Sequence, residues 1–386
     1  MRLLLATIAA AYLALAPLPA SAAADPVWEQ WQTVSGVFDL GGPRSDGSLV
    51  VAGSGTLYLA DPAGSVTPFA SGAGGYHQDA GAEAYLAVAP GAPTRAAGCS
   101  FTRDEVFLLR LHAPLGIERV NAPGENTASF ANITGVTSLN GIAFDTTGYF
   151  DHRLLASGVS GGKTVIAAVD CLGIVQVITS IAPILEGGLA VAPDDFGSYG
   201  GYLTAPDELS GNIYAIAPNG TVTTIAKPAL PTGGDIGVES IGFVPHGFMR
   251  GGGKVYYADR KTPGNPHPGT DNVLRLSSTD LAAAGVQDGD LLVATEGGAT
   301  LSAVRCAASC TVIPVVTTPT TAHGEGHIVF TIDKATPIPT PTPSPSPKAA
   351  TPTSNSQPPG VVIALGILIL LMLVVAGGLL ARRRRR

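Results

Sequence analysis

A set of short apolar runs recurs along the chain about every 50 residues, and this repetition limits the possible folds more than any other feature. One kind of run occurs at residues 84–90, 141–145, 188–193 and 240–245. A second kind follows downstream, at residues 49–53, 154–157, 202–205, 255–258 and 291–294. Their length and their apolar, β-rich content predict β-strands, and the fixed period predicts a repeat architecture.

The third element of each repeat is a hairpin, in which an apolar strand reaches a turn and a second strand returns. Its copies lie at residues 56–69, 106–120, 164–178, 212–225 and 301–316. Asn219-Gly220 is the strongest turn signal among them. Units of an inner strand, a middle strand and an outer hairpin, at this period, predict the four-stranded blades of an all-β fold, the β-propeller.

The number of hairpins sets the number of blades. A sixth hairpin begins at residues 272–276, and an insertion at 280–290 obscures its return strand. We therefore expect six blades of four strands, with seven as the alternative. Residues 327–330 resemble an inner strand with no blade after it, so the simplest closure has this C-terminal strand complete the first blade. Residues 36–39 compete for the same place, and the sequence leaves both possibilities open.

Composition agrees with this class of fold. The chain of 386 residues has 45% hydrophobic and 13% charged residues, with 49 glycines and 31 prolines. It is too apolar for a disordered protein and too rich in turn residues for a helical one. Without Arg2 and the arginines at 382–386, 16 basic residues remain against 29 acidic ones. A nucleic-acid partner is therefore not expected.

The N-terminal residues have the features of an export signal. An arginine at position 2 precedes an apolar run, and Ala20-Ser21-Ala22 forms a small-residue cleavage site. We expect residues 1–22 to be a secretory signal peptide and residues 23–334 to form an extracellular propeller domain.

The C-terminal residues predict a membrane anchor. Residues 335–359 are rich in Pro, Ser and Thr, a composition that favours an extended stalk. Residues 360–381 lack charge and would form a transmembrane helix of about 33 Å, the thickness of the hydrocarbon layer. The arginines at 382–386 place that end in the cytoplasm. The prediction is a single-pass cell-membrane protein with its N-terminal domain outside.

Two resemblances follow from these patterns. The stalk, apolar helix and arginine cluster resemble the tripartite C-terminal sorting signals of prokaryotic surface proteins. Over residues 34–333, the strand pattern resembles the superfamily of six-bladed propellers that includes NHL-repeat proteins and the senescence-marker-protein/gluconolactonase family. The second resemblance implies acidic and amide side chains around one divalent metal.

A set of polar residues stands immediately before the predicted inner strands, where the mouth of the channel would lie. Its members are Glu83, Asn140, Glu186, Glu239 and Glu325, with Asp280 or Glu296 for the remaining blade. If the register is right, they converge into a ring of oxygen ligands, which suits Ca²⁺ or another divalent metal. The alternative is that they are solvated residues at the starts of strands.

Two further motifs contain residue types that can carry chemistry. In His323-Gly-Glu325-Gly-His327, three ligand-type side chains alternate, which on an extended strand puts them on one face, suitable for a transition metal. The two glycines favour a flexible entry loop instead. Gly158-Val-Ser160-Gly-Gly162 matches a nucleophile elbow, but it joins two predicted strands with no helix after it, so we interpret it as a turn.

The four cysteines all lie in the exported domain, which permits two disulfides. Cys306 and Cys310 flank the turn of the last hairpin, close enough to be joined. Cys99 and Cys171 would then pair by exclusion and bridge neighbouring blades. A zinc site is the alternative, but no paired Cys-x-x-Cys spacing supports it.

Two functions fit these features. The first is a surface-anchored propeller without catalysis that binds a carbohydrate, peptide or protein outside the cell. The second is a metal-dependent extracellular hydrolase of the lactonase type, with the channel-mouth ring as its metal site and one carboxylate as general base.

Overall fold

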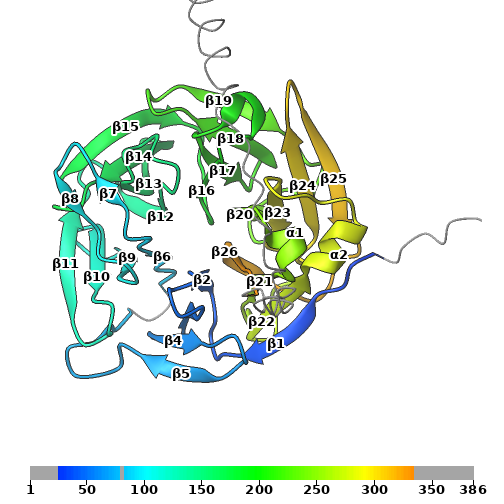
Figure 1. The fold of residues 1–386 in the computed structure, drawn as a ribbon, viewed down its shortest axis with the longest axis horizontal. Coiled ribbons are helices and arrows are strands. Elements are labelled where there is room, and N and C mark those ends of the chain that lie inside the picture. Colours follow the sequence, from blue (N-terminus) through cyan, green and yellow to red (C-terminus); the bar gives the residue numbers. More distant parts are fainter. Residues whose placement is uncertain (1–24, 79–81, 334–386) are drawn as a thin grey trace, which may run out of the picture. The chain divides into compact units, whose positions relative to one another are not determined.

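Six four-stranded antiparallel sheets stand around a central channel, so the fold is an all-β propeller of six blades, as predicted (Figure 1). The computed structural model describes residues 25–78 and 82–333. The predicted signal peptide, stalk, transmembrane helix and arginine tail lie outside these residues. Within the described ranges, no helix is both long and apolar enough to cross a membrane.

The first four blades follow chain order, each from its inner to its outer strand. Blade 1 contains β2 (Asp39–Gly41), β3 (Leu49–Gly53), β4 (Thr56–Ala60) and β5 (Val66–Phe69). Blade 2 contains β6 (Leu86–Val88), β9 (Val106–Arg110), β10 (Gly116–Val120) and β11 (Thr127–Asn132), with the hairpin β7 (Pro93–Thr94) and β8 (Cys99–Ser100) inserted after β6. Blade 3 contains β12 (Ser138–Phe144), β13 (Leu154–Ser160), β14 (Lys163–Val169) and β15 (Val175–Ala182). Blade 4 contains β16 (Ala190–Val191), β17 (Leu203–Asp207), β18 (Asn212–Ile216) and β19 (Val222–Ala226), with the short helix η1 (Gly197–Tyr199) after β16.

The last two blades are interleaved along the chain. Blade 5 contains β20 (Val238–Phe243), β23 (Leu291–Thr295), β24 (Leu301–Cys306) and β25 (Cys310–Val316). Blade 6 contains β26 (Gly324–Thr331), β21 (Lys254–Asp259), β22 (Asn272–Ser277) and β1 (Glu29–Thr33). After β20 the chain therefore crosses to blade 6 for β21 and β22, returns to blade 5, and ends in blade 6. Two short helices, α1 (Phe248–Gly251) and α2 (Ser278–Ala283), lie along these crossings.

The ring closes in blade 6, which corrects the expected closure. The C-terminal strand β26 pairs with β21 and not with the first blade, whose inner position is taken by β2. The N-terminal strand β1 pairs with β22 and forms the outer edge of the same blade. This N-terminal strand supplies the return strand that the sequence obscured at residues 280–290, where the chain instead begins α2 and continues toward β23. Strands from both ends of the domain thus pair within one blade and close the ring.

The apolar core lies between the faces of neighbouring blades. Second strands such as β3 and β23 are buried along their whole length, which explains why they read as continuous apolar runs. Between blades 2 and 3, the rings of Phe101 and Phe107 meet Phe144 edge to face, with centroids 4.9 Å and 5.5 Å away. The apolar side chains that make the repeats recognisable in the sequence therefore also pack the blades against one another.

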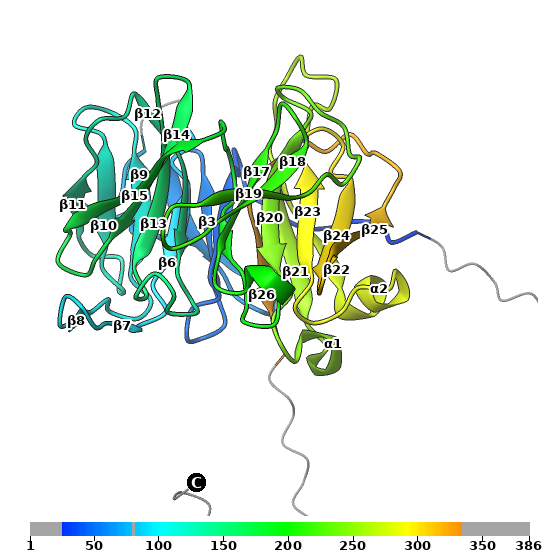
Figure 2. The same cartoon turned by 90° about the horizontal axis from the view of Figure 1, so that it is seen from above.

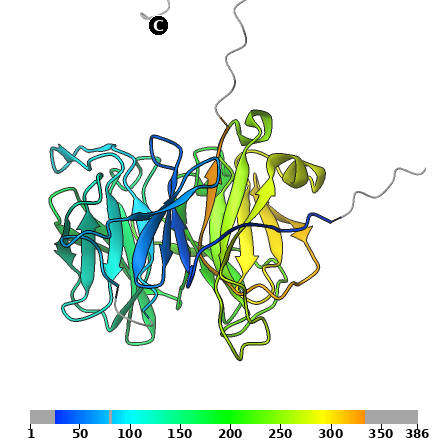
Figure 3. The same ribbon diagram turned by 90° about the horizontal axis from the view of Figure 1, so that it is seen from below.

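The inner strands run in the same direction along the channel, so their first residues gather at one mouth and their last residues at the other. Figures 2 and 3 show the ring from the side, with α1, α2 and the β7–β8 hairpin on one face. Because these elements follow inner or third strands, that face is the one where inner strands end. The mouth that the sequence marked with glutamates is the opposite one.

Both predicted disulfides are present. Cys99 in the β7–β8 hairpin is bonded to Cys171, which lies in the turn between β14 and β15, so the bond joins blades 2 and 3. Cys306 and Cys310 face each other across the β24–β25 hairpin and are also bonded. The motif around Ser160 forms the β13–β14 turn, as expected for two strands in direct succession.

Candidate functional site

A cavity of about 310 Å³ opens at the mouth where the inner strands begin. It is lined by Glu83, Tyr85, Glu186, Glu208, Asp235, Glu239, Arg260, Thr262, Glu296, His323 and Glu325. Seven of these eleven side chains are carboxylic acids, against one arginine and one histidine. A larger cavity of about 650 Å³ at the other mouth is lined mainly by prolines and apolar residues, so the acidic groups are concentrated at one end.

Four of the five predicted ring residues line this cavity. Glu83, Glu186, Glu239 and Glu325 all reach it from the starts of inner strands. Asn140 does not line it, because its amide nitrogen donates to the Leu185 carbonyl at 2.8 Å and its amide oxygen accepts from Ser157. Metal binding by the ring as a whole stays a prediction.

The remaining blade contributes Glu296, one of the two alternatives weighed from the sequence. The other alternative, Asp280, is wrong. Its carboxylate accepts hydrogen bonds from the Ser277 backbone and hydroxyl in a capping box that begins α2. This carboxylate caps a helix and is not part of the cavity lining.

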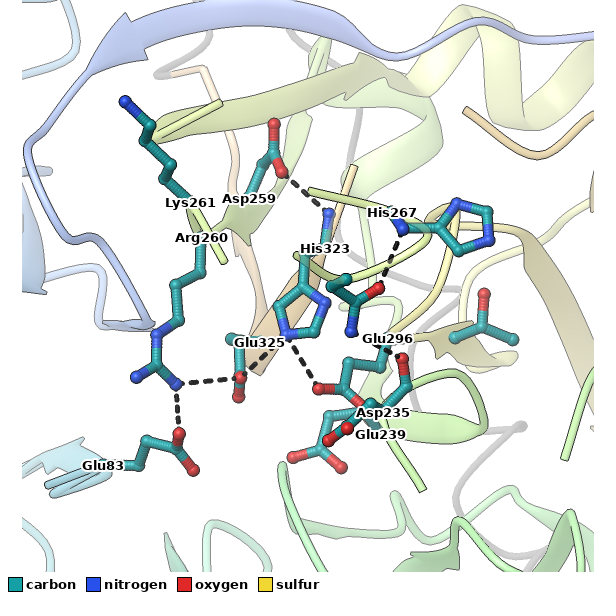
Figure 4. A network of polar contacts seen from close by, with 12 residues as sticks. Glu83, Asp235, Glu239, Asp259, Arg260, Lys261, His267, Glu296, His323 and Glu325 are labelled. Carbon is teal, nitrogen blue, oxygen red and sulfur yellow. Dashed lines mark hydrogen bonds and ion pairs between the residues drawn. The ribbon is translucent and has the colours of Figure 1, made fainter. Parts of the chain in front are cut away.

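His323 lies at the centre of the acidic cluster (Figure 4). Its Nε2 is 2.9 Å from Glu296 Oε1 and 3.6 Å from Glu325 Oε1, and its backbone N–H donates to Asp259 at 2.9 Å. Burial alone would lower the pKa of His323, but the two carboxylates outweigh burial and raise the pKa to about 9. The imidazole therefore carries a proton at neutral pH unless a metal replaces it.

His327 does not share a face with His323 and Glu325, so the expected alternation is wrong for this residue. Gly326 has a φ of +69°, and the pairing of β26 with β21 shifts register beside it. This bulge turns His327 inward along the channel. Its Nδ1 lies 2.9 Å from Asp39 Oδ1, and its Nε2 lies 2.7 Å from the Ile142 carbonyl.

Two buried glutamates share the hydroxyl of Tyr85. Its oxygen lies 2.9 Å from Glu239 Oε1 and 3.2 Å from Glu325 Oε2. Burial is the main reason that the pKa values of Glu239 and Glu325 are raised, and repulsion from neighbouring carboxylates adds to it. Their surroundings therefore disfavour the charged form of both glutamates.

Glu186 and Glu208 are half-buried in the same cavity. Burial, followed by the nearby carboxylates, raises the pKa of Glu186 to about 7. Burial and a hydrogen bond shared with Glu296 raise the pKa of Glu208 to about 7. Two carboxyl groups can share a hydrogen bond only if one holds a proton, so Glu208 and Glu296 act as a pair with a common proton.

Arg260 is the arginine of the cavity, and it reaches across the mouth between two blades (Figure 4). Its Nη1 donates to Glu83 and, at 3.2 Å, to Glu325. The guanidinium thus balances part of the negative charge on one side of the cavity. Glu208, Asp235 and Glu296 lie on the part of the lining that Arg260 does not contact.

Some cavity residues were not singled out by sequence reasoning, among them Glu208 and Arg260, which share one position with the predicted Glu296. Glu208 directly follows β17, Arg260 follows β21, and Glu296 follows β23. These are second strands, which run antiparallel to the inner strands and so end at the mouth where inner strands begin. The strand pattern of the sequence therefore contained a usable signal, because the residue directly after a second strand lies at this mouth.

One group of side chains fits a metal ion. Glu296, His323 and Glu325 each offer one ligand atom, and these atoms lie within 4.8 Å of one another. All three residues are buried, and among the described residues they are the group of three or more that meets this distance. The donor set of two carboxylates and one imidazole suits a divalent transition ion.

Comparison with known proteins finds distant structural likenesses that carry no argument about this chain. No protein-family model matches the sequence, and no curated protein matches it. Solved structures that resemble the chain include a virginiamycin B lyase from Staphylococcus aureus, with 13% identity over 79% of this chain and 96% of that chain, at a TM-score of 0.42. A streptogramin B lyase has 12% identity over 81% of this chain and 97% of that chain, at a TM-score of 0.44. A gluconolactonase from Xanthomonas campestris has 14% identity over 61% of this chain and 69% of that chain, at a TM-score of 0.36. Likeness at this level carries no information about the chemistry of the cavity.

Proposed function

We propose that this propeller binds an extracellular ligand at its acidic mouth, and that a divalent cation held by Glu296, His323 and Glu325 is part of that site. The observation that carries the proposal is the convergence of three buried ligand atoms to within 4.8 Å of one another at the base of a cavity. Buried carboxylates at such distances repel, and a divalent cation offsets that repulsion.

The residues present fit such an ion. The Nδ1 atom of the buried His323 has no hydrogen-bond partner among the described residues, while Nε2 faces two carboxylates. In metal sites one imidazole nitrogen binds the ion and the other donates a hydrogen bond, so Nε2 would bind the ion here and the Nδ1–H group would donate to an acceptor such as water. Because imidazole is a better ligand for Zn²⁺ or Mn²⁺ than for Ca²⁺, we expect the transition ions to bind more tightly.

The place of the protein in the cell is part of the same proposal. The signal peptide, stalk and transmembrane segment predicted from the sequence would display the domain outside the cell, anchored by one span. The two disulfides support this location, since such bonds persist in oxidising compartments.

Calorimetric titration of the full-length chain in a non-ionic detergent tests the cation site. After treatment with chelator, the wild type should bind one equivalent of Mn²⁺ or Zn²⁺, more tightly than Ca²⁺. Glu296→Gln should weaken binding at least tenfold, while Glu125→Gln, the same change at an exposed residue outside the cavity, should leave it unchanged. A wild type that binds none of these ions would reject the site.

Metal-dependent hydrolysis is a second candidate, favoured by the position of Glu186 and Glu208. Both carboxyls line the cavity that holds the cation triad, with pKa values of about 7 that suit proton transfer at neutral pH. When bound, a divalent cation supplies a Lewis acid for a carbonyl oxygen. Glu186, which has no hydrogen-bond partner among the described side chains, is placed to take a proton from water.

A pH-stat assay separates the two candidates. Hydrolysis of a panel of sugar lactones by the metal-loaded wild type, reduced at least a hundredfold in Glu186→Gln, would support the enzyme. Ligand binding without acid release from any lactone would leave the binding function alone.

A further inference from the structure

The outer carboxylates of the cavity need a different explanation from the metal triad. Glu83, Glu186, Glu208 and Asp235 line the same cavity, yet the cation group contains none of them. Their ligand atoms do not come within 4.8 Å of one another in groups of three, among the described residues. As a set they do not offer the three close ligand atoms of a metal site, although they line one cavity.

Arg260 shows that this arrangement already holds one organic cation. Its guanidinium lies between Glu83 and Glu325, from two different blades, and is paired with both. Glu186, by contrast, has no ion-pair or hydrogen-bond partner among the described side chains, although burial and four acidic neighbours raise its free energy of ionisation. The charge of Glu83 is therefore neutralised by the chain itself, and that of Glu186 is not.

The charge that remains after metal binding defines the class of ligand. Seven carboxyl groups line the cavity and two of them share one proton, so at most six negative charges face the three positive charges of a divalent ion and Arg260. An anionic ligand would enter an acidic cavity against this excess, whereas a cation would offset it. The buried Oε1 atom of Glu208, an acceptor without a hydrogen-bond partner among the described residues, is a second sign that the lining is incomplete without a bound donor.

We infer that the ligand of this site carries an ammonium or guanidinium group, which is recognised by Glu186, Glu208 and Asp235 on the side of the cavity that Arg260 does not cover. This inference rests on the proposed function, because it assigns the ligand class of the same cavity. A volume of about 310 Å³ accommodates a small amine-bearing molecule or one side chain of a basic peptide.

Three five-carbon probes that differ only in charge test the inference. Cadaverine carries two ammonium groups, 1,5-pentanediol is neutral, and glutarate carries two carboxylates. Calorimetry or ligand-observed NMR on the full-length chain, saturated with Mn²⁺, should detect binding of cadaverine and of neither analogue. Glu186→Gln should weaken cadaverine binding at least tenfold and change Mn²⁺ affinity less than threefold, and Glu125→Gln should change neither.

The outcomes separate the inference from the function on which it rests. Mn²⁺ binding without any cadaverine binding, or equal binding of all three probes, would overturn the ligand class and leave the cation site intact. Cadaverine binding that Glu186→Gln does not weaken would also overturn it, since the cation would then lie elsewhere. Loss of Mn²⁺ binding with selective cadaverine binding would reject the metal site and support the organic-cation site.

Discussion

Two buried carboxylates in the same channel, Asp39 and Glu239, are treated very differently by their surroundings. Asp39 is fully buried and accepts hydrogen bonds from the backbone N–H groups of Leu40, Leu86 and His327 and from the His327 ring. Glu239 is 3% exposed, accepts from Tyr85, and faces other carboxylates. A buried acid with all its acceptor sites filled stabilises a fold, and one without them marks a place kept for a ligand.

The Asp39 pair works as a link between blades. Asp39 begins β2 in blade 1, Leu86 begins β6 in blade 2, and His327 lies in β26 of blade 6. Through His327 Nε2 and the Ile142 carbonyl, the network also reaches β12 in blade 3. Burial alone would lower the pKa of His327, but Asp39 and this carbonyl outweigh it and raise the pKa. One ion pair therefore joins four of the six inner strands.

The largest expected effect comes from breaking that link. Asp39→Asn should reduce the free energy of unfolding by about 3–5 kcal/mol, because it removes one partner of a buried ion pair and sets an amide N–H against a backbone donor. Equilibrium unfolding in urea, followed by tryptophan fluorescence, measures the change. A loss of unfolding free energy below about 1 kcal/mol would show that Asp39 does not stabilise the fold in the way proposed.

The matched change at the mouth should act in the opposite direction. In chelator, Glu239→Gln should raise the free energy of unfolding by about 1 kcal/mol, or the melting temperature by about 2 °C, because it removes repulsion from Glu325, Glu186 and Glu296. The amide oxygen of glutamine can still accept from Tyr85. Destabilisation comparable to that of Asp39→Asn would mean that both carboxylates serve the fold.

A smaller effect is expected from pH. The pKa values of Glu186 and Glu208 are raised to about 7 from the ordinary value of 4.5, so the folded protein keeps protons that the unfolded chain has lost. In chelator, stability should therefore fall as the pH rises from 4.5 to about 7, by roughly 1 kcal/mol or less because both groups are partly exposed. Below pH 4.5 both states are protonated and the penalty disappears.

Melting curves at pH 5 and pH 7.5 measure this slope, and Glu186→Gln should flatten it. His323 contributes in the same direction at higher pH, since its pKa of about 9 means that its stabilisation is lost as the pH rises through that value. A melting temperature that rises between pH 5 and pH 7.5 would contradict the assignment of the mouth as a strained acidic site.

The sequence predicted features that depend on local patterns. Strand runs, the Asn219-Gly220 turn, the number of blades and both disulfides follow from residues close to one another or related by the repeat. Glu83, Glu186, Glu239 and Glu325 were placed at one mouth because they share a position before inner strands. Such positions are equivalent by rotation about the channel, so pattern alone brings them together.

What the sequence could not predict depends on partners distant in the chain. The interleaving of blades 5 and 6 was missed because β20 and β26 have similar patterns, and nothing local says which of them pairs with β21. Asn140 does not line the cavity because its amide bonds to the Leu185 carbonyl and the Ser157 hydroxyl, two partners that no local pattern predicts. His327 was misplaced because the bulge at Gly326 depends on close approach to Asp39, where a Cβ would lie 2.3 Å from Oδ1.

Thermal melting with and without metal tests most directly whether the mouth is kept for a cation. After chelation and addition of Mn²⁺ at a hundredfold excess over its dissociation constant, the wild type should gain about 2.7 kcal/mol in free energy of unfolding. Glu325→Gln should lose this gain, and Glu125→Gln should retain it. A melting temperature that neither chelator nor Mn²⁺, Zn²⁺ or Ca²⁺ changes would contradict the account and leave the acidic mouth without its cation.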